Sequence, residues 1–449
     1  MHEPHHPPRA PAREGSGKHG NVDASGGTDH GVPLVPGSNI PSSLPPPRRR
    51  GPFSSFRHRN FRVFFFGYTV SLVGVWMHRV AQSWLVLDLT DSAFYVGLAS
   101  ALTALPVLLF TLYAGVLADR VSKHRMVVTT QAASMVVGLA LAAVVLAGVV
   151  ELWHVLFLAT LLGVATAFDI PARQSFLVEL VGRDDLGNAI ALNSSAFNAS
   201  RVVGPAVAGL LIAAVGVGLC FLLNGISYAA VLVALVAMRL PPFQPRHQPT
   251  STWERVRDGV RYVMGDARMR VLIVNVAALS VFGFPVVVLL PVVARDVLGR
   301  GAEAFGWMTA AVGIGALAGA LGLAVFGGRI HRGKTVAWTS AAFGVLVAAF
   351  GLARSLGPAL ALLAAGGFVQ IVTTALTNML LQTLAPDELR GRVVSFYTFA
   401  FLGLTPFGAL QAGTVASRVG AGSALVVGGI VCALASLMLV RSRELRGTP

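Results

Sequence analysis

The chain has 449 residues, of which 54% are apolar and only 12% charged, and its mean hydropathy is +0.69. A water-soluble protein carries about 25% charged residues, so the composition excludes a soluble globular protein. The formal net charge is +15, but the cations are spread over many short segments instead of one folded face, which argues against nucleic-acid binding.

The first element is a polar tail, residues 1–54. Its first fifty residues are rich in Pro, Gly, Ser and His and hold no apolar run. This composition predicts a disordered segment and not a signal peptide, which would need an apolar core. We expect no metal site in its scattered histidines, and none at the two cysteines, which lie far apart in apolar segments and predict no disulfide.

Apolar runs of about 20 residues follow, and each is long enough to cross a hydrocarbon core of about 30 Å as a helix. They lack the two-residue alternation of a barrel strand, so helices are expected. The sequence predicts twelve membrane spans, at residues 61–87, 92–118, 126–148, 152–172, 188–214, 217–238, 269–293, 302–326, 335–354, 356–384, 391–416 and 421–440.

The placement of Lys and Arg predicts the orientation of these spans. With the N-terminus inside, 26 cations lie in or near the inner segments and only four in the outer loops, at Arg295, Arg300, Arg354 and Arg418. Inner loops are the positive ones in membrane proteins, so both termini should be cytoplasmic. Arginine outnumbers lysine 32 to 3, as in a GC-rich bacterial genome, and we expect a bacterial inner (plasma) membrane.

The longest internal polar stretch divides the spans six and six. Residues 239–268 form this linker, and apolar residues at helical spacing within it predict an amphipathic helix on the inner membrane surface. The expected domains are then an N-terminal bundle at 55–238, a C-terminal bundle at 269–440 and a cytoplasmic tail at 441–449.

The two halves repeat one another. "GRDDLGNAIALNSSAF" (182–197) before span five resembles "APDELRGRVVSFYTFAF" (385–401) before span eleven, and "DRVSKHR" (119–125) is matched by "GRIHRGK" (328–334) after span eight. Two related six-helix bundles are the architecture of transporters whose substrate site lies between the halves at mid-membrane depth.

Several motifs resemble those of the major facilitator superfamily. "GVLADRVSKHR" (115–125) is similar to its signature between spans two and three, and "NASRVVGPAVAGLLI" (198–212) to the Gly-Pro motif of its exporters. "DIPARQSFLVELV" (169–181) and "LRGRVVSFYTFAFLG" (389–403) resemble the bacterial branch with the enterobactin exporter and multidrug efflux proteins. The resemblance covers about residues 55–440. It implies an all-α membrane protein with twelve transmembrane helices in two pseudo-symmetric six-helix bundles.

The loop after span two is the expected cytoplasmic gate. We hypothesise that Asp119 meets the N-terminal end of span eleven, whose free amides attract an anion, and that Arg392 there adds to the attraction. This contact exists only while the halves are closed on the inner side. Gly115 would allow close approach, while Arg120 and Arg125 either bridge to acids and lipid phosphates or only set the topology.

Asp169 and Arg173, one turn apart near the inner end of span four, form a second candidate for the gate. The aspartate is a possible proton carrier, and a plain ion pair at a helix end is the alternative. In the second half Gly328 stands where the resembled signature has an aspartate, so the latch should rest on the N-terminal half.

Polar side chains inside the spans usually face a cavity or a partner. Arg201, near the centre of span five, has either a substrate or coupling role or is pinned to Asn193 and nearby carbonyls. His78 either titrates near neutral pH or is a packing histidine. In the resembled family such spans line a central cavity, and our candidates are Ser71, His78, Arg79, Gln82, Asn198, Arg201, Gln370, Thr374 and Asn378.

Gly204, Pro205 and Gly209 should let span five pack closely and bend, and the resemblance implies that this helps to seal the cytosolic leak of an exporter. No nucleotide motif lies outside the spans, so we expect no cofactor and an ion gradient, that of protons, as the energy source. We therefore expect a monomeric, proton-coupled exporter of small amphipathic molecules, such as a drug, siderophore or secondary metabolite. An importer or uniporter of the same fold, a membrane-embedded enzyme and a non-transporting sensor or scaffold are the alternatives.

Overall fold

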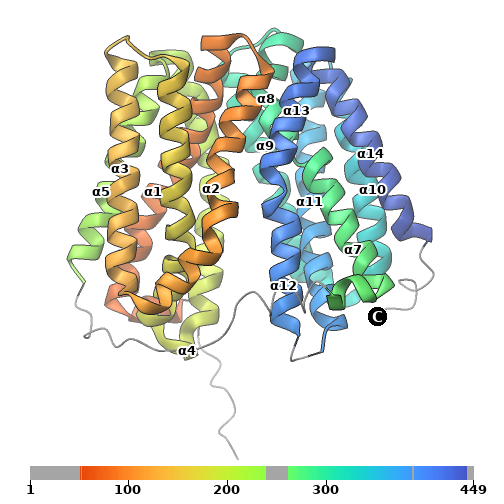
Figure 1. Ribbon diagram of the computed structural model, residues 1–449, viewed down its shortest axis with the longest axis horizontal. Helices are drawn as coiled ribbons and strands as arrows, with labels where there is room; N and C mark the ends of the chain where they lie inside the picture. Colours follow the sequence, from red (N-terminus) through yellow and green to blue (C-terminus); the bar gives the residue numbers. More distant parts are fainter. Residues whose placement is uncertain (1–50, 52, 239–260, 387–388, 442–449) are drawn as a thin grey trace, which may run out of the picture. The chain divides into compact units, whose positions relative to one another are not determined.

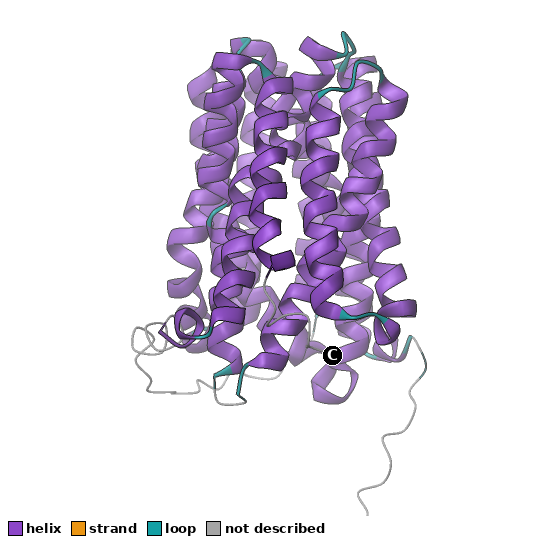
Figure 2. Cartoon of the chain, turned by 90° about the vertical axis from the view of Figure 1, so that its right-hand side faces the viewer, coloured by secondary structure: helices purple, strands orange, loops and turns teal. Residues whose placement is uncertain are grey.

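The computed structural model describes residues 51, 53–238, 261–386 and 389–441. The expected disordered tail up to residue 50 and most of the expected linker helix therefore lie outside the described residues. Every regular element among the described residues is a helix, and Figure 2 shows long helices that cross the molecule side by side.

The first half of the described chain contains five α-helices. A 3-10 turn at Ser54–Arg57 precedes them, and the helices are α1 (Arg59–Thr90), α2 (Ala93–Arg120), α3 (Lys123–Leu146), α4 (Leu152–Val215) and α5 (Val217–Val236). The 64 residues of α4 would measure about 96 Å if straight, three times the thickness of a bilayer core. Gly182, with a φ of 71°, interrupts it, so α4 supplies two membrane spans.

The described part of the second half contains a short helical stretch at residues 261–265 and eight α-helices, some of which join into longer spans. They are α7 (Ala267–Ala278), α8 (Val286–Val292), α9 (Ala302–Phe326), α10 (Arg332–Gly351), α11 (Leu356–Leu384), α12 (Arg390–Thr398), α13 (Thr405–Val419) and α14 (Ala421–Arg441). A π-helical turn at Leu279–Gly283 joins α7 to α8, and another at Phe399–Gly403 joins α12 to α13. Prolines 285 and 406 follow these two turns, where they remove a helical N–H group.

These helices confirm the expected fold. Eleven helical segments of the described chain are long and apolar enough to cross a membrane, and one of them is the double-length α4. The result is twelve spans, six in residues 53–238 and six in residues 261–441, which we call the N-terminal and C-terminal halves. Figure 1 shows the two groups of helices, with α1 to α5 in one and α7 to α14 in the other.

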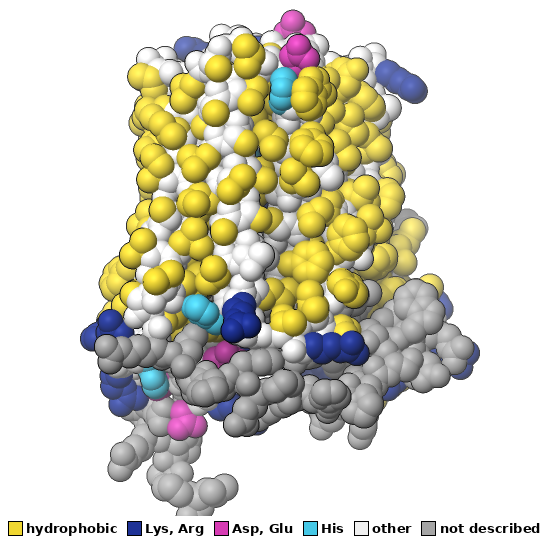
Figure 3. Space-filling view, turned by 60° about the vertical axis from the view of Figure 1, so that its left-hand side comes forward, with side chains coloured by type: hydrophobic (Ala, Val, Ile, Leu, Met, Phe, Trp, Pro, Cys, Tyr) yellow, Lys and Arg dark blue, Asp and Glu magenta, His cyan; other side chains and the backbone are white. Residues whose placement is uncertain are grey.

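The helices run between two polar faces. We call the one where α1 begins and α14 ends the terminal face, which is the lower one in Figure 1, and the opposite one the far face. Figure 3 shows a broad apolar belt between these faces on the side that it presents, with Lys and Arg gathered below the belt. An apolar belt bounded by charge is the surface that a lipid bilayer solvates.

The hydrophobic core consists of three clusters, and their distribution bears on function. One lies in the N-terminal half near the terminal face, around Phe61, Phe64 and Phe176. Another lies in the C-terminal half near the same face, around Met269 and Leu272. The third and largest lies near the far face and contains residues of both halves, including Leu85, Phe221, Leu289, Phe305 and Leu363. The halves therefore share a core only toward the far face.

Candidate functional site

Two pairs of glycines bring the halves together near the far face. A methyl group at Gly97 of α2 would lie 2.5 Å from the carbonyl oxygen of Ala409 in α13, and Gly413 lies against the same part of α2. A methyl group at Gly209 of α4 would lie 2.9 Å from the carbonyl oxygen of Ala302 and 3.0 Å from the Cα of Gly306 in α9. Side chains larger than hydrogen would hold these helices apart.

The two glycine contacts correspond to each other under the internal repeat, because spans two and five of the first half match spans eight and eleven of the second. One joins span two to span eleven, and the other joins span eight to span five. The Gly-Pro motif thus contributes to a contact between the halves, since the carbonyl oxygen of Pro205 also lies 2.6 Å from a methyl position at Gly306. Gly204 makes a contact within the N-terminal half, because α4 packs closely against Trp76 of α1 at this glycine. The contacts of Pro205 and Gly209 lie toward the far face, whereas the resemblance led us to expect a role in sealing the cytosolic leak.

An ion pair crosses between the halves at the far face. Arg295 Nη1 donates to Asp91 Oδ1 (2.7 Å) and to the carbonyl oxygen of Leu87 (3.1 Å), and Nε donates to Asp296 Oδ1 (2.7 Å). In the sequence Arg295 is predicted only to lie in an outer loop, and no pattern there indicates this link.

Asp169 lies at the centre of a polar network inside the N-terminal half. Arg173 Nε donates to Asp169 Oδ2 (3.0 Å), while Thr130 Oγ1 and Gln131 Nε2 of α3 donate to Oδ1 (3.1 and 2.9 Å). The guanidinium of Arg173 lies 4.6 Å from the ring centre of Tyr68 in α1. The pair expected from the sequence is present, and it connects three helices of this half.

Two further arginines lie near one aromatic ring. The Cζ atom of Arg79 is 4.9 Å and that of Arg201 is 6.0 Å from the ring centre of Trp76. Trp76 in turn packs edge-on against Phe197. Arg79 is exposed although it is within α1. Asn198, one turn before Arg201, donates to the carbonyl oxygen of Ser194.

The polar stripe expected in span one packs within the N-terminal half instead of facing open space. Ser71, His78 and Gln82 are all buried. His78 lies 3.2 Å from Gln82 Oε1 and 3.2 Å from Asn224 Nδ2 of α5, and Gln82 Nε2 reaches Thr103 of α2 (3.5 Å). Three helices are thereby joined by hydrogen bonds, which favours the packing role for His78.

The polar residues of span ten lie on α11. Thr374 is buried and its hydroxyl bonds to the carbonyl oxygen of Gln370, while its own carbonyl accepts from Tyr397 of α12. Asn378 accepts a hydrogen bond from Gln382. Gln370 and Asn378 are half-buried.

The residues of the expected cytoplasmic gate lie at the terminal face. The side chain of Asp119 lies outside the described residues. A methyl group at Gly115 would meet no atom within 4 Å, so the close approach expected there does not occur in this conformation. Arg120 and Arg125 are exposed, and Arg392 is half-buried in the first turn of α12.

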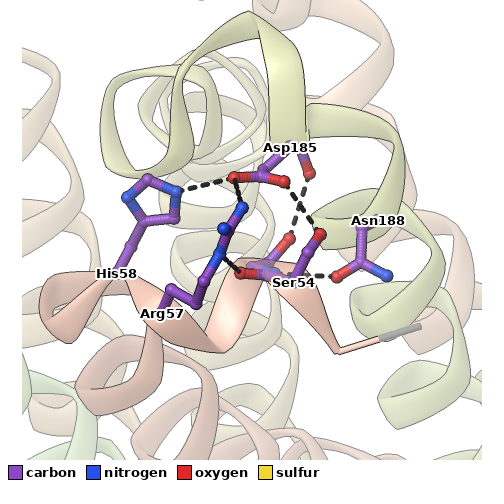
Figure 4. A network of polar contacts seen from close by, with 6 residues as sticks. Ser54, Arg57, His58, Asp185 and Asn188 are labelled. Carbon is purple, nitrogen blue, oxygen red and sulfur yellow. Dashed lines mark hydrogen bonds and ion pairs between the residues drawn. The ribbon is translucent and has the colours of Figure 1, made fainter. Parts of the chain in front are cut away.

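One buried carboxylate at the terminal face was not anticipated. Asp185, at the start of the second span of α4, is 3% exposed. Its carboxylate accepts from Ser54 (2.8 Å) and from Arg57 (3.3 Å), and lies 2.9 Å from Nε2 of His58. Figure 4 shows these side chains converging on Asp185 from the segment before α1.

Two more bonds complete this contact: Ser55 donates through its hydroxyl to the Asp185 carbonyl and through its N–H to Asn188. We call residues 54–58 the N-terminal clamp. The repeated "GRDDLGNA" marked the loop, but nothing in the sequence paired it with residues at the boundary between the expected tail and the N-terminal bundle.

Comparisons with known proteins agree with this architecture. A family described as "Transmembrane secretion effector" matches residues 50–447. The chain is 29% identical over 378 residues to the multidrug efflux pump Tap of Mycolicibacterium fortuitum, covering 82% of this chain and 92% of that one. It is 26% identical over 404 residues to the enterobactin exporter EntS of Escherichia coli O1:K1, covering 87% and 94%.

Solved structures support the fold. A bacterial homologue of the iron transporter ferroportin, in an inward-facing state, superposes with a TM-score of 0.66 at 15% identity over 86% of this chain and 99% of that one. An inward-facing bacterial homologue of the lysosomal transporter Spinster gives 0.64 at 13% identity over 87% and 96%.

Proposed function

The chain belongs to the transmembrane secretion effector family of the major facilitator superfamily, and from this premise we propose that it is a proton-coupled exporter of small amphipathic molecules. It is a multi-pass membrane transporter and not an enzyme. The direction, the coupling ion and the substrate class are the parts that we propose. Export is supported by its similarity to a drug efflux pump and to a siderophore exporter.

The distribution of the hydrophobic core supports transport by alternating access of the two halves. The halves share one core toward the far face and have separate cores toward the terminal face. We propose that the terminal face is cytoplasmic, as the excess of Lys and Arg there favours, and that this conformation is inward-facing. A substrate would then enter from the cytosol and leave after the shared core has separated and the terminal sides have met, as in alternating access.

Asp169 is the residue that we assign to proton coupling. A membrane-embedded carboxylate that is partly exposed, 13% here, can exchange protons with water that enters from one side. Protonation would remove the negative charge that holds Arg173, Gln131 and Thr130, so it would loosen the contact between α3 and α4. His78 has its ring nitrogens near Gln82 and Asn224 and is fully enclosed, so it is less suited to this role.

Transport in proteoliposomes tests the proposal. Efflux of a panel of labelled drugs and siderophores would be followed with and without an imposed pH difference, and by counterflow without one. The wild-type protein should concentrate at least one solute only when the pH gradient is present. Asp169→Asn should lose this pH-driven accumulation and retain counterflow, because exchange of bound solute needs no net proton movement.

His78→Gln is the matched control, since it replaces a second titratable group in the same half. It should keep pH-driven accumulation while lowering thermal stability, because a buried hydrogen-bond network is altered. Accumulation that follows the solute gradient alone, unaffected by pH, would show a uniporter or importer instead. Ligand binding without flux would show a sensor.

A further inference from the structure

The pair of arginines around Trp76 remains unexplained by proton coupling. Arg79 lies eleven residues before Thr90, where α1 ends, which is about 16 Å from that end at 1.5 Å per residue. Arg201 lies fourteen residues before Val215, the end of α4, or about 21 Å. Both guanidiniums therefore lie deep within the membrane-spanning part, where an unneutralised charge is unfavourable.

Neither arginine is neutralised by another described residue of the protein. Among the described residues, Arg79 and Arg201 form no ion pair and donate no hydrogen bond, and both guanidiniums lie near the Trp76 ring. The expected pin from Arg201 to Asn193 is not made, since Asn193 Oδ1 is buried without a hydrogen-bond partner. The carboxylate of Asp169, in the same half, is already paired with Arg173.

The opposite half does not supply the missing negative charge either. Its residues 267–295, 304–385 and 389–440 contain no Asp or Glu, and the two acids between the first two ranges, Asp296 and Glu303, lie at the far face. Gln370 and Asn378 provide only uncharged polar groups. The membrane-embedded part thus holds three arginines, Arg79, Arg173 and Arg201, against one aspartate, Asp169, and the surplus charge is on the two arginines at Trp76.

Close helix packing explains why the two arginines are together. Gly204 of α4 lies against α1, with a methyl position only 2.5 Å from Trp76 Cβ and 2.9 Å from the Val73 carbonyl oxygen. Arg201 is one turn before Gly204, and Arg79 is one turn after Trp76. The glycine of the exporter motif therefore places both guanidiniums at the same aromatic ring. Since Arg79 is exposed, this cluster is accessible and not sealed inside the N-terminal half.

We propose that Arg79, Trp76 and Arg201 bind the anionic group of the transported substrate. This inference rests on the proposed transport function and narrows its substrate to amphipathic anions, such as carboxylates, catecholates or sulfonates with an apolar part. Each guanidinium offers paired N–H donors that match an oxyanion. The apolar part of the substrate would contact Trp76 and Phe197. An anion here would neutralise charge that the protein leaves uncompensated, whereas a cation would be repelled.

Three fluorescent probes that share one aromatic group but differ in charge provide the test. Dansylglycine is an anion, dansylamide is neutral and dansylcadaverine is a cation near neutral pH. Binding to the purified full-length protein in nanodiscs would be measured by fluorescence polarisation. Dansylglycine should bind at least tenfold more tightly than dansylcadaverine, because two charge-assisted contacts replace repulsion.

Variants of the two arginines identify the site. Arg79→Gln and Arg201→Gln should each weaken dansylglycine about tenfold or more and leave dansylamide unchanged, while the lysine variants should lose less because they keep the charge. Arg354→Gln, at an exposed far-face cation, is the control and should change neither probe. If a glutamine variant at one position does not fold, dansylglycine binding is compared in the lysine variant at that position and in the glutamine variant of the other arginine. Equal binding of dansylglycine by both glutamine variants and wild type, or tighter binding of dansylcadaverine, overturns the site.

Different outcomes would disprove the anion site and the transport function. Proteoliposomes that transport neutral and cationic solutes but no anion would disprove the substrate class and leave the transporter proposal standing. Anion binding that depends on both arginines, without flux of any solute, would disprove export and retain the site.

Discussion

Arg295 of the C-terminal half lies 2.7 Å from the Asp91 carboxylate of the N-terminal half, and the same guanidinium nitrogen binds the carbonyl oxygen of Leu87. Asp91 directly follows α1 and has a positive φ of 48°, and its side chain and the carbonyl oxygen of Leu87 in the last turn of the helix both accept from this arginine. A cation at a helix C-terminus is favourable because the free carbonyls there are partially negative. Arg295 thus links the two halves at the face where they share a core.

Arg295→Gln should shift the equilibrium toward the conformation that is open at the far face. Asp91 is 83% exposed, so the pair is screened and contributes only about 1 kcal/mol, or a roughly fivefold change in population. Spin labels at Val149 and Leu352, exposed on the far face of different halves, should show a larger fraction of long distances by pulsed electron resonance. Arg300→Gln, a nearby cation without this contact, should not. An unchanged distribution in Arg295→Gln would show that the pair does not hold the halves together.

Gly97→Ala should hinder closure of the far face more strongly than loss of the ion pair does. The added methyl group would lie 2.5 Å from the Ala409 carbonyl oxygen, a distance that real Cβ atoms do not adopt, so α2 and α13 must separate. Transport should fall at least tenfold while the folded fraction is retained. Gly357→Ala is the control because its methyl group would meet nothing within 4 Å. Normal flux in Gly97→Ala would mean that this close packing is dispensable.

The architecture could be predicted from the sequence because a membrane span is indicated by the summed hydropathy of about 20 consecutive residues, and its orientation by the summed charge of the loops. Twelve spans, the internal repeat and the ion pair of Asp169 with Arg173 all follow from residue spacing along single helices. Contacts between distant segments do not have such a pattern. Arg295 with Asp91 and Asp185 with the N-terminal clamp connect residues more than 120 positions apart, and each involves a residue that was assigned to a loop or tail.

Burial could not be predicted for the polar stripe of span one either. Ser71, His78 and Gln82 share one face of a helix, and a stripe of this kind faces either a cavity or another polar helix. Here the stripe packs against other polar helices, because His78 lies within hydrogen-bond distance of Asn224 and Gln82 within that of Thr103. Arg79 is adjacent to His78 in sequence but lies on a different face of the helix, where it is exposed.

Asp185→Ala should release the N-terminal clamp. The buried carboxylate receives bonds from Ser54 and Arg57 and contacts His58, so its loss should lower stability by about 1–3 kcal/mol. Limited trypsin digestion should then cleave faster after Arg57 and Arg59. Glu179→Gln breaks only the more exposed pair with Lys123 (2.7 Å) and should leave both measurements almost unchanged. Equal cleavage in all three proteins would show that the clamp is held by other contacts.

Asp119→Asn should act in the opposite direction to Arg295→Gln. If Asp119 latches the cytoplasmic side against the start of span eleven, its loss favours the inward-facing state that we infer from the shared far-face core. A cysteine at Ser395, exposed on α12, should react faster with a soluble maleimide in Asp119→Asn and more slowly in Arg295→Gln. Arg120→Gln controls for the loss of a neighbouring charge.

The variant that combines Asp119→Asn with Arg295→Gln makes this comparison sharper, because the two residues lie at opposite faces. Distant, independent changes add in free energy, so the combined protein should return toward the wild-type labelling rate. Its turnover should nevertheless stay low, because the contact that closes the far face and the contact that closes the cytoplasmic side are both lost. A double variant that labels at the Arg295→Gln rate would show that Asp119 does not bias the equilibrium and that the cytoplasmic latch lies elsewhere.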